Sequence, residues 1–555
     1  MKEKTRDTMR ICTSSEMREL DRVAEQEYLL DAAVLMENAG RAAAQIIAEK
    51  YPHAGRTTEI LVFAGKGNNA GDAFVVARRL LCLDRKVRIF HLQEESGYKG
   101  ASLKNFQILK AMKARLNLIE NPADLQSFFQ SSPGPFTVVD GIIGTGLRGG
   151  LEGIYYDVVE MINGSGAQEV IALDIPSGVN GDTGAVVGAS IHAHLTISFG
   201  FPKLGHFLPP GAARRGELFN VDISLPPKFK HEGDKYLLRK GPMGRLLTER
   251  DLYGHKNSFG HTLLVGGTPG RIGAITMAAR ACHKIGTGLV TVASWEDGFE
   301  PLMIKLPSET MAVPLKTSGP DYEFYKKNLN TYSSIVVGPG LGTRPEGQQV
   351  IEEILSIYQG PMVIDADALN IISTHKLHEM LAARRAPTVL TPHPGEMARL
   401  LGVSNEVVVS DPVKAVRDAV SMTHAIVLLK GAATLVTSPD DVLYLNHYPN
   451  DGMATAGSGD VLSGMIGGLL GQKMDAFQAT LLGIYLHSVA GDFAAQQFGH
   501  RSMTAADIIE NISNAFKEIK AHPQSPTAVA SGVTGVTNVP QPQTVLSMEG
   551  RARLL

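Results

Sequence analysis

Short apolar runs recur along this 555-residue chain, and each ends in a loop rich in Gly, Asp or Asn before helical spacing of apolar residues resumes. The runs span residues 60–64, 87–91, 136–139, 170–173 and 195–199 in the first half, and 261–265, 288–293, 334–337, 362–364, 388–390 and 425–429 in the second. Strands that alternate with helices form parallel sheets, whose ligands bind at the carboxyl ends of the strands. We therefore expect an α/β protein of two domains whose strand-end loops carry its function.

Charge and composition exclude several classes of partner. The net charge is −3 with both signs dispersed, so the chain has neither a basic footprint for nucleic acid nor a polybasic patch for a membrane. The first ten residues lack the apolar core of a secretory signal. The longest apolar segment, residues 461–470, is about half the length of a membrane-spanning helix, so we expect a buried helix there. We therefore expect the partners of this protein to be small molecules.

The three cysteines are Cys12, Cys82 and Cys282, which lie far apart and form no CxxC pattern. Neither a disulfide framework nor a zinc site is indicated, and a cytoplasmic location is expected. An exposed apolar face on the two helices predicted within residues 15–50 would suit a homo-oligomer.

The segment 450–464, NDGMATAGSGDVLSG, indicates a phosphate site. Four residues with little or no side chain, 456–459, allow their backbone N–H groups to close around an anion, and the helix that follows adds its positive dipole end. Asp460 at this junction suits a general base that deprotonates a hydroxyl about to attack a phosphoryl group. The alternative is an aspartate that only caps a Gly-rich helix start, which is the commoner meaning of a bare GxGD pattern.

Three predicted strands of the first half end in unusual chemistry. The first is followed by GKGNNAGDA, the third by Asp140 and GTGLRGG, and the fourth by Asp174 and IPSGVNGDTG. An aspartate after a strand is usually a turn or cap residue, but three such ends on one edge of a sheet predict a site. Backbone amides of residues 144–150 could bind a pyrophosphate, and oxygens of Asn69, Asp140 and Ser177 could coordinate a hard cation.

These first-half motifs resemble the NNGGD, D-x-x-x-GTG and D-x-PSG-x-x-x-DTG motifs of the NAD(P)H-hydrate epimerase domain, which has a Rossmann-like parallel sheet. The resemblance places this domain at residues 11–228, makes Asp174 the candidate acid/base for epimerisation, and implies a potassium ion on Asn69, Asp140 and Ser177. It implies that the hydrated nicotinamide nucleotide is bound by Asn68, Asn69, Ala70, Gly71, Asp72, Gly144, Thr145, Gly146, Leu147, Arg148, Gly149, Gly150 and Asp174.

The chain departs from this family at two positions, because Ala70 and Ala73 stand where the family has glycines. If Ala70 had to adopt a positive φ, the loop would be strained by roughly 1 kcal/mol or more. The sequence therefore leaves open whether the first half is an active epimerase or a binding module without activity.

The polar segment 224–242, with two consecutive prolines, predicts the boundary between the domains. Beyond it, HKNSFGHTLLVGG, VVGPGLG, VIDADALN, TPHPGEM, LLKGAAT and TAGSGDVLSG resemble, in this order, the ADP-dependent NAD(P)H-hydrate dehydratase, which has a ribokinase-like α/β sheet. This domain is expected at residues 240–520, and residues 521–555 are expected to be a disordered tail.

The second resemblance implies roles for another set of residues. Those implied to contact the adenine nucleotide are Lys430, Gly431, Ala432, Ala433, Thr434 and Gly459, and those implied to face the hydrate are Ala274, Gly340, His393 and Asp460. Magnesium is expected with the nucleotide, although no carboxylate pair in the sequence identifies its ligands. On residues alone, His393 is equally consistent with a structural histidine, and Lys430 with a solvated charge after a buried strand.

The hypothesis that follows is repair of hydrated NADH and NADPH, in which one half interconverts the R and S hydrates and the other dehydrates the S form with ADP. The alternative is a small-molecule kinase of vitamin precursors, since a ribokinase-like site uses the same anion loop and aspartate, with a first half that only binds.

Overall fold

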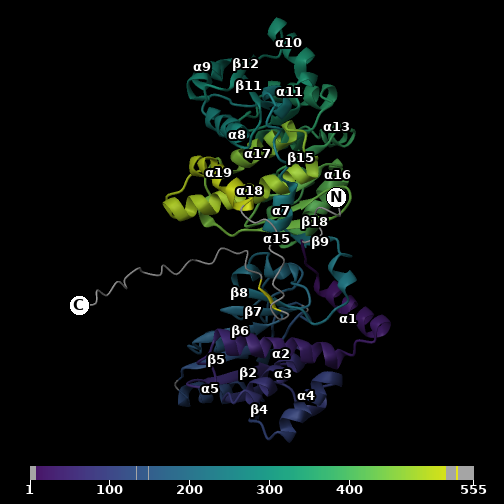
Figure 1. The fold of residues 1–555 in the computed structure, drawn as a ribbon, viewed down its shortest axis with the longest axis vertical. Helices are drawn as coiled ribbons and strands as arrows, with labels where there is room; N and C mark the ends of the chain where they lie inside the picture. The colour runs from purple at the N-terminus through teal and green to yellow at the C-terminus, as the bar shows by residue number, and fades with distance from the viewer. Residues whose placement is uncertain (1–7, 133, 148, 521–532, 536–555) are drawn as a thin grey trace, which may run out of the picture.

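The computed structural model describes residues 8–132, 134–147, 149–520 and 533–535. Figure 1 shows two lobes stacked along the long axis of the molecule. Every predicted apolar run is a strand, with ends at most two residues from those expected. The first lobe is built on one sheet and the second lobe on another, so the predicted α/β class is confirmed.

The first sheet has eight strands in the order β19-β8-β7-β6-β5-β2-β3-β4. All neighbours are parallel except β19, which pairs antiparallel with β8. Its bounds are β2 Glu59–Ala64, β3 Val87–His91, β4 Leu116–Leu118, β5 Phe136–Gly141, β6 Glu169–Leu173, β7 Leu195–Phe199, β8 Glu217–Val221 and β19 Val533–Gly535. The parallel order brings the carboxyl ends of β2, β5, β6 and β7 to one edge.

The second sheet has eleven strands in the order β1-β9-β18-β17-β16-β15-β14-β13-β10-β11-β12. The run from β16 through β12 is parallel, whereas β17 pairs antiparallel with both of its neighbours. Its bounds are β1 Met9–Arg10, β9 Lys235–Leu237, β10 His261–Val265, β11 Leu289–Trp295, β12 Met311–Leu315, β13 Ser334–Val337, β14 Met362–Ile364, β15 Thr388–Leu390, β16 Ile426–Leu429, β17 Ala433–Thr437 and β18 Leu443–His447.

Helices cover both sheets. In the first lobe they are α1 Ser14–Tyr28, α2 Ala32–Lys50, α3 Asn68–Cys82, α4 Gly100–Ala111, α5 Pro122–Ser131 and α6 Ile154–Asn163. In the second they are α7 Lys240–Leu246, α8 Ile272–Lys284, α9 Glu296–Lys305, α10 Pro320–Asn328, α11 Pro345–Ile357, α12 Ala366–Thr374, α13 His378–Ala382, α14 Pro394–Leu401, α15 Asn405–Ser410, α16 Pro412–Thr423, α17 Ser458–Gly471, α18 Ala476–Phe498 and α19 Ala505–Lys520. Separate apolar cores lie on the two faces of the second sheet, one beneath α8, α17, α18 and α19 and the other beneath α11, α12, α14 and α16.

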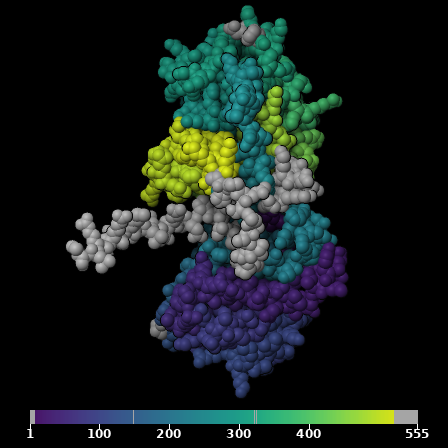
Figure 2. Space-filling view, viewed as in Figure 1, coloured from purple at the N-terminus to yellow at the C-terminus, as the bar shows by residue number. Residues whose placement is uncertain are grey.

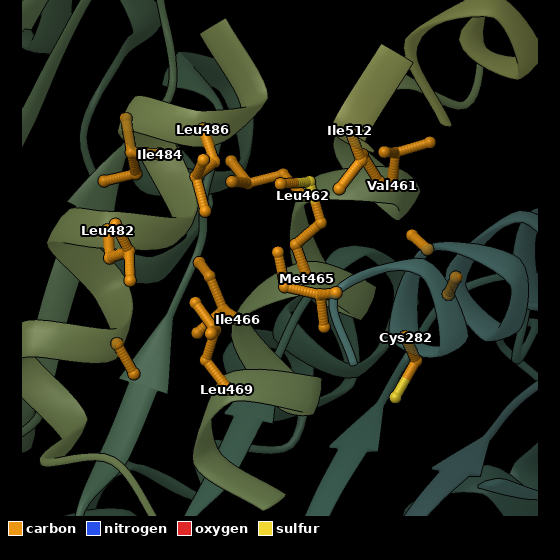
Figure 3. Packing of buried hydrophobic residues seen from close by; sticks show 14 of the residues in the cluster. Cys282, Val461, Leu462, Met465, Ile466, Leu469, Leu482, Ile484, Leu486 and Ile512 are labelled. Atoms are coloured by element: carbon orange, nitrogen blue, oxygen red, sulfur yellow. The ribbon is translucent and has the colours of Figure 1, made fainter. Parts of the chain in front are cut away.

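Helix α17 is the buried helix expected at residues 461–470. Figure 3 shows its side chains Val461, Leu462, Met465, Ile466 and Leu469 among residues of α8, α18 and α19. Glycines allow this depth: a Cβ on Gly464 would lie 2.2 Å from the carbonyl oxygen of Ala278, and one on Gly467 would lie 2.1 Å from Val336 Cγ2. Close packing of α17 against α8 and β13 fixes where its N-terminus points.

The two lobes share structure at their junction. Strand β1 comes from the start of the chain, yet it pairs with β9 in the second sheet, and α1 then returns to the first lobe. Arg215, just before the first-lobe strand β8, is buried, and its Nη2 lies 3.1 Å from His447 Nε2 on β18. In Figure 2 the purple and blue residues lie at one end of the molecule and teal and green residues at the other, with the yellow residues between them.

The predicted boundary at residues 224–242 lies where the chain leaves the first sheet after β8 and enters the second at β9. Of the predicted tail, residues 521–532 and 536–555 lie outside the described residues. The three described residues between them form β19, which departs from the expectation of a tail without secondary structure. Among the described helices, none is both long and apolar enough to cross a membrane.

Candidate active sites

The anion loop opens helix α17 as the sequence predicts. Gly457 is its N-cap with φ 93°, a conformation that residues other than glycine rarely adopt, and no side chain in the described part of the chain caps the helix start. The first N–H groups of α17 are therefore available to a bound anion, at the positive end of the helix dipole.

Lys430 lies against this helix start and is surrounded by carboxylates. Its Nζ is 2.8 Å from Asp365 Oδ1 and 3.7 Å from Glu396 Oε2, and a Cβ built on Gly459 would be 3.3 Å from it. Burial disfavours the ammonium ion, but Asp365 and Glu396 outweigh that effect, so the pKa of Lys430 is raised. Lys430 is therefore a buried cation in an ion-pair network and not a solvated charge.

Asp460 lies in the first turn of α17 within the field of this network. Burial raises its pKa to about 7, and the carboxylates of Asp365, Asp367 and Glu396 add to this effect, while the Lys430 ammonium opposes it. A carboxylate with a pKa close to neutral can accept a proton from a hydroxyl group and release it again. This behaviour distinguishes Asp460 from an ordinary N-cap aspartate.

His393 caps α14, and its ring is half exposed beside the same network. Its Nδ1 accepts hydrogen bonds from the backbone N–H groups of Gly395 and Glu396, so the neutral ring carries its proton on Nε2, which is 3.4 Å from Glu396 Oε1. Burial, with Lys430 and Arg399 nearby, lowers the pKa of His393. The histidine thus has a structural role in the cap and one nitrogen that faces the carboxylate of Glu396.

Two further predicted residues meet across the loop after β13. Gly340 has φ 61°, and a Cβ on it would lie 2.4 Å from the carbonyl oxygen of Arg271 and 3.3 Å from the Cβ of Ala274. Residues 431–434 cover the turn after β16 and the first two residues of β17, and Thr434 Oγ1 donates to the carbonyl of Gly431 at 3.2 Å.

The first lobe gathers a second group of polar residues at the ends of β2, β5 and β6. Asp140 is fully buried and accepts hydrogen bonds from Ser177 Oγ at 2.6 Å, Ser177 N at 2.9 Å and Ile142 N at 3.1 Å. Burial raises its pKa to about 6 against the effect of these bonds. With its amide oriented to satisfy both ends, Asn69 accepts from Gly144 N at 3.2 Å.

Asp174 follows β6 in a left-handed conformation with φ 63°. The buried ammonium of Lys203 donates to its Oδ1, and His206 Nε2 is 2.8 Å from its carbonyl oxygen. Since His206 Nδ1 accepts from the N–H of Lys203, Nε2 carries the ring proton and donates it. Lys203 and His206 belong to the GFPKLGH segment after β7, and they hold the carboxylate and the backbone of Asp174 in place.

Gly144, in the loop after β5, lies between the side chains of Asn69 and Asp174. A Cβ on Gly144 would be 3.2 Å from Asn69 Cγ and 3.3 Å from Asp174 Oδ2. The first turn of α3, the loop after β5 and the residue after β6 therefore converge at one edge of the sheet, as parallel strand ends predict.

Two family models match the chain: "NAD(P)H-hydrate dehydratase" at residues 262–514 and "YjeF-related protein N-terminus" at residues 32–205. A bifunctional NAD(P)H-hydrate repair enzyme of Moorella thermoacetica is 38% identical over 533 residues, which are 95% of this chain and 99% of the relative. The chain belongs to the family of bifunctional NAD(P)H-hydrate repair enzymes. Two further relatives carry the same name. The enzyme from Thermofilum pendens is 34% identical over 92% of this chain and 97% of the relative, and the enzyme from Escherichia coli is 33% identical over 88% of this chain and 91% of the relative.

Among solved structures, an ADP/ATP-dependent NAD(P)H-hydrate dehydratase from Bacillus subtilis, co-crystallised with ATP and Mg2+, is 26% identical. The similarity covers 51% of this chain and 97% of that chain, with a TM-score of 0.44.

The structure adds residues that sequence reasoning missed. In the second lobe these are Asp365, Asp367, Glu396 and Ser463, and in the first lobe Arg18, Asp21, Lys203 and His206. Part of this set was indicated by the sequence: Asp365, Asp367, Glu396, Lys203 and His206 lie in the segments DADALN, TPHPGE and GFPKLGH, each of which follows a predicted strand. The contacts of Arg18 and Asp21 had no such signal, since α1 reaches the cleft only through tertiary packing.

The two family departures do not strain the loop. Ala70 and Ala73 lie inside α3, which starts at Asn68, and both are fully buried without a positive φ. The residue with a positive φ is Gly67, just before the helix, with φ 90°. The methyl group of Ala73 fits because it packs against Gly141, which has no side chain. The strain considered for Ala70 is therefore absent, because helix geometry begins before this residue.

Of the predicted loop 144–150, Arg148 lies outside the described residues. The carbonyl of Thr145 accepts from Arg18 Nη1 at 3.0 Å, and a Cβ on Gly150 would lie 2.6 Å from the carbonyl oxygen of Val187. A Cβ on Gly146 would meet no atom of the described residues within 4 Å. This part of the loop offers an open backbone to a ligand, while Gly150 serves packing.

Replacement of Ala70 by glycine is expected to leave epimerisation within about twofold and to lower stability by about 1 kcal/mol, because glycine is the poorer helix residue and a buried methyl group is lost. Rates on R hydrate and urea midpoints would be compared with Ala123→Gly, an exposed position near the start of α5. A several-fold faster Ala70→Gly enzyme would instead mean that alanine impairs this site.

Proposed function

We propose that the chain repairs hydrated NADH and NADPH with two active sites. The first lobe interconverts the R and S hydrates, and the second dehydrates the S hydrate with ADP, releasing AMP and phosphate. The observation that carries the proposal is Asp460, a carboxyl with a pKa of about 7 in the first turn of an uncapped helix, next to the Lys430 network.

In the proposed dehydration, Asp460 takes the proton of the hydrate's hydroxyl as the oxygen attacks the terminal phosphoryl group of the nucleotide. The N–H groups of Gly457, Ser458 and Gly459 stabilise charge on the transferred phosphoryl. Phosphate then leaves from the ring carbon together with the neighbouring ring proton, which restores the double bond. Residues 430–434 would bind the nucleotide, and Ala274, Gly340 and His393 would border the hydrate.

Magnesium fits the second lobe only together with a nucleotide. Among the described residues, no group of three or more His, Cys, Asp or Glu side chains is gathered to hold a metal ion. Magnesium commonly uses one or two carboxylates plus substrate phosphates, and Asp365 and Glu396 beside Lys430 would provide them. The ion would neutralise phosphate charge during transfer.

A potassium ion would fit the first lobe. Asp140 is a buried carboxylate, and across the described ranges it has hydrogen bonds but no ion pair with a lysine or arginine. A monovalent cation held by Asn69, Asp140 and Ser177 would supply the missing positive charge.

We also propose a cytoplasmic location, because the three cysteines are free and a reducing compartment keeps thiols in this state. Tyr28, Leu29 and Val34, exposed around the α1–α2 turn, would be the docking face of a second copy.

The test is the near-ultraviolet absorbance of reduced nicotinamide, followed with mixed R and S NADH hydrate, magnesium, potassium and ADP. Full recovery in a fast and then a slow phase is the expected result, because dehydration consumes the S form while epimerisation replenishes it. Recovery that stops after the S fraction would remove the epimerase half of the proposal. No recovery with ADP or ATP would overturn it in favour of a small-molecule kinase.

A further inference from the structure

Asp72 is a half-buried carboxyl group that faces other charges without pairing to any of them. It lies in the second turn of α3, three residues after Asn69, so the two side chains share a face of the helix. Within the described chain its carboxyl has no hydrogen bond and no ion pair. Burial, then the carboxylates of Asp174 and Asp21, raise its pKa well above the usual range, and Lys203 opposes them only in part.

Asp174 has the opposite surroundings. The ammonium of Lys203, which is buried with a side chain 1% exposed, donates to Asp174 and to the carbonyl of Phe199 at 3.0 Å. An ammonium ion in direct contact stabilises an ionised carboxylate. The cleft therefore contains one carboxyl without a counter-charge, Asp72, and one with a lysine counter-ion, Asp174.

Helix α1 adds a third carboxylate above the cleft. Asp21 is half-buried, and burial together with Asp174 raises its pKa to about 6, while Lys203 opposes the shift. One turn earlier, Arg18 anchors α1 to the carbonyl of Thr145 at 3.0 Å. The charged groups that act on Asp72 are thus Asp21 on α1, Asp174 after β6 and Lys203 after β7.

We propose that Asp72 is a catalytic residue of the epimerase site, acting as the general acid opposite Asp174 as the general base, with Lys203 as the residue that positions Asp174. This inference rests on the proposed epimerisation. Two carboxyl groups whose surroundings differ in this way can divide the acid and base roles between them.

The chemistry balances through loss and return of water. Asp72 gives its proton to the ring hydroxyl, the carbon–oxygen bond breaks as the ring nitrogen lone pair forms a carbon–nitrogen double bond, and water leaves. A water molecule then adds to the opposite face of the ring carbon and gives its proton to Asp174. The product is the other epimer, with Asp72 ionised and Asp174 protonated. The reverse reaction, or proton exchange between the two carboxyls through water, restores the starting state.

The test uses the full chain with pure R NADH hydrate in the absence of nucleotide, so that dehydration does not occur, and separates the epimers chromatographically. Asp72→Asn is expected to lower kcat for epimerisation by about 10²- to 10⁴-fold. In water enriched in oxygen-18, the unmutated protein is expected to place one solvent oxygen in each epimerised molecule. Turnover of S hydrate with ADP should be unchanged in the variant, which shows that it is folded.

Lys203 is tested by a pair of variants. Lys203→Met is expected to lower kcat for epimerisation at least tenfold, and Lys203→Arg, which keeps the positive charge, is expected to recover a large part of it. The matched control for Asp72→Asn is Asp84→Asn, the same substitution at an exposed position just beyond α3, which should leave epimerisation unchanged. Asp21→Asn should keep kcat within a few-fold at its optimum and move the alkaline limb of the pH profile to lower pH, because it removes a charge that raises the pKa of Asp72.

Three results would overturn this assignment: epimerisation by Asp72→Asn within threefold of the unmutated rate, retention of the original oxygen, or equal loss in Lys203→Met and Lys203→Arg. Retained oxygen would indicate opening of the ring at its carbon–nitrogen bond. An unmutated protein that converts S hydrate but never R hydrate would remove the epimerase function itself, and this result is separate from the other three.

Discussion

Asp460→Asn is expected to lower kcat for dehydration of S hydrate by about 10²- to 10⁴-fold while epimerisation continues. The amide cannot take the hydroxyl proton, yet it keeps the size and the helix-start position of the carboxyl group. The two activities are measured separately on one preparation, by absorbance recovery with ADP and by epimer ratio without it.

The pH profile gives a second view of Asp460. Its pKa is raised to about 7, first by burial and then by Asp365, and the base must be ionised to act. Dehydration is therefore expected to rise with pH through about 7 and to level off above it. The same raised pKa means that ionisation of Asp460 weakens the folded state as pH rises from the usual aspartate range to about 7.

The control for Asp460 is Asp451→Asn in the same loop, where the side chain is 87% exposed and bonded to His500. It should leave dehydration within about twofold, because the residue is outside the network. Dehydration by Asp460→Asn at more than a tenth of the unmutated rate would exclude Asp460 as the base.

Lys430→Met is expected to cost about 3–5 kcal/mol of stability in the second lobe. Asp365 has a side chain 1% exposed, and without Lys430 its one remaining side-chain partner among the described residues would be Ser463. Because Lys430 lowers the pKa of Asp460, the variant should also shift the pH midpoint of any remaining dehydration upward. Urea unfolding and the pH profile measure the two effects.

A double-mutant cycle separates charge from size at this position. Lys430→Met with Asp365→Asn should recover part of the lost stability, since no uncompensated carboxylate remains at residue 365. Lys414→Met, which breaks an exposed pair with Asp418, should cost about 1 kcal/mol or less. Equal costs for Lys430→Met and Lys414→Met would contradict the network described for Lys430.

The strands and their chemistry were predictable from the sequence because they depend on local patterns. A short apolar run of three to six residues between turn-forming residues favours a buried strand over a helix because it is too short for a helix, and parallel strands align their ends. That alignment is why Asn69, Gly144 and Asp174, far apart in the chain, were expected together and are found together. The buried helix after Asp460 followed from the same reasoning.

Edge strands were not predictable in the same way. Strands β1 and β9 have two and three residues, and β17 and β18 form a hairpin at the mixed end of the second sheet. Segments as short as β1 and β9 carry too little periodicity to be told from loops, and partners far away in sequence determine whether they pair. The crossing of β1 into the second sheet is a tertiary outcome of this kind.

The sequence by itself determined the α/β class, the two-part organisation and the loops in which chemistry gathers, because these depend on periodicity and residue type over short windows. Only the tertiary structure decided which charges meet. Lys203 reaches Asp174 from the end of the next strand, α1 brings Asp21 over the same cleft, and Asp365 turns Lys430 into a buried ion pair. Electrostatic shifts depend on burial and on distances of a few ångströms between side chains, and no window of sequence contains those distances.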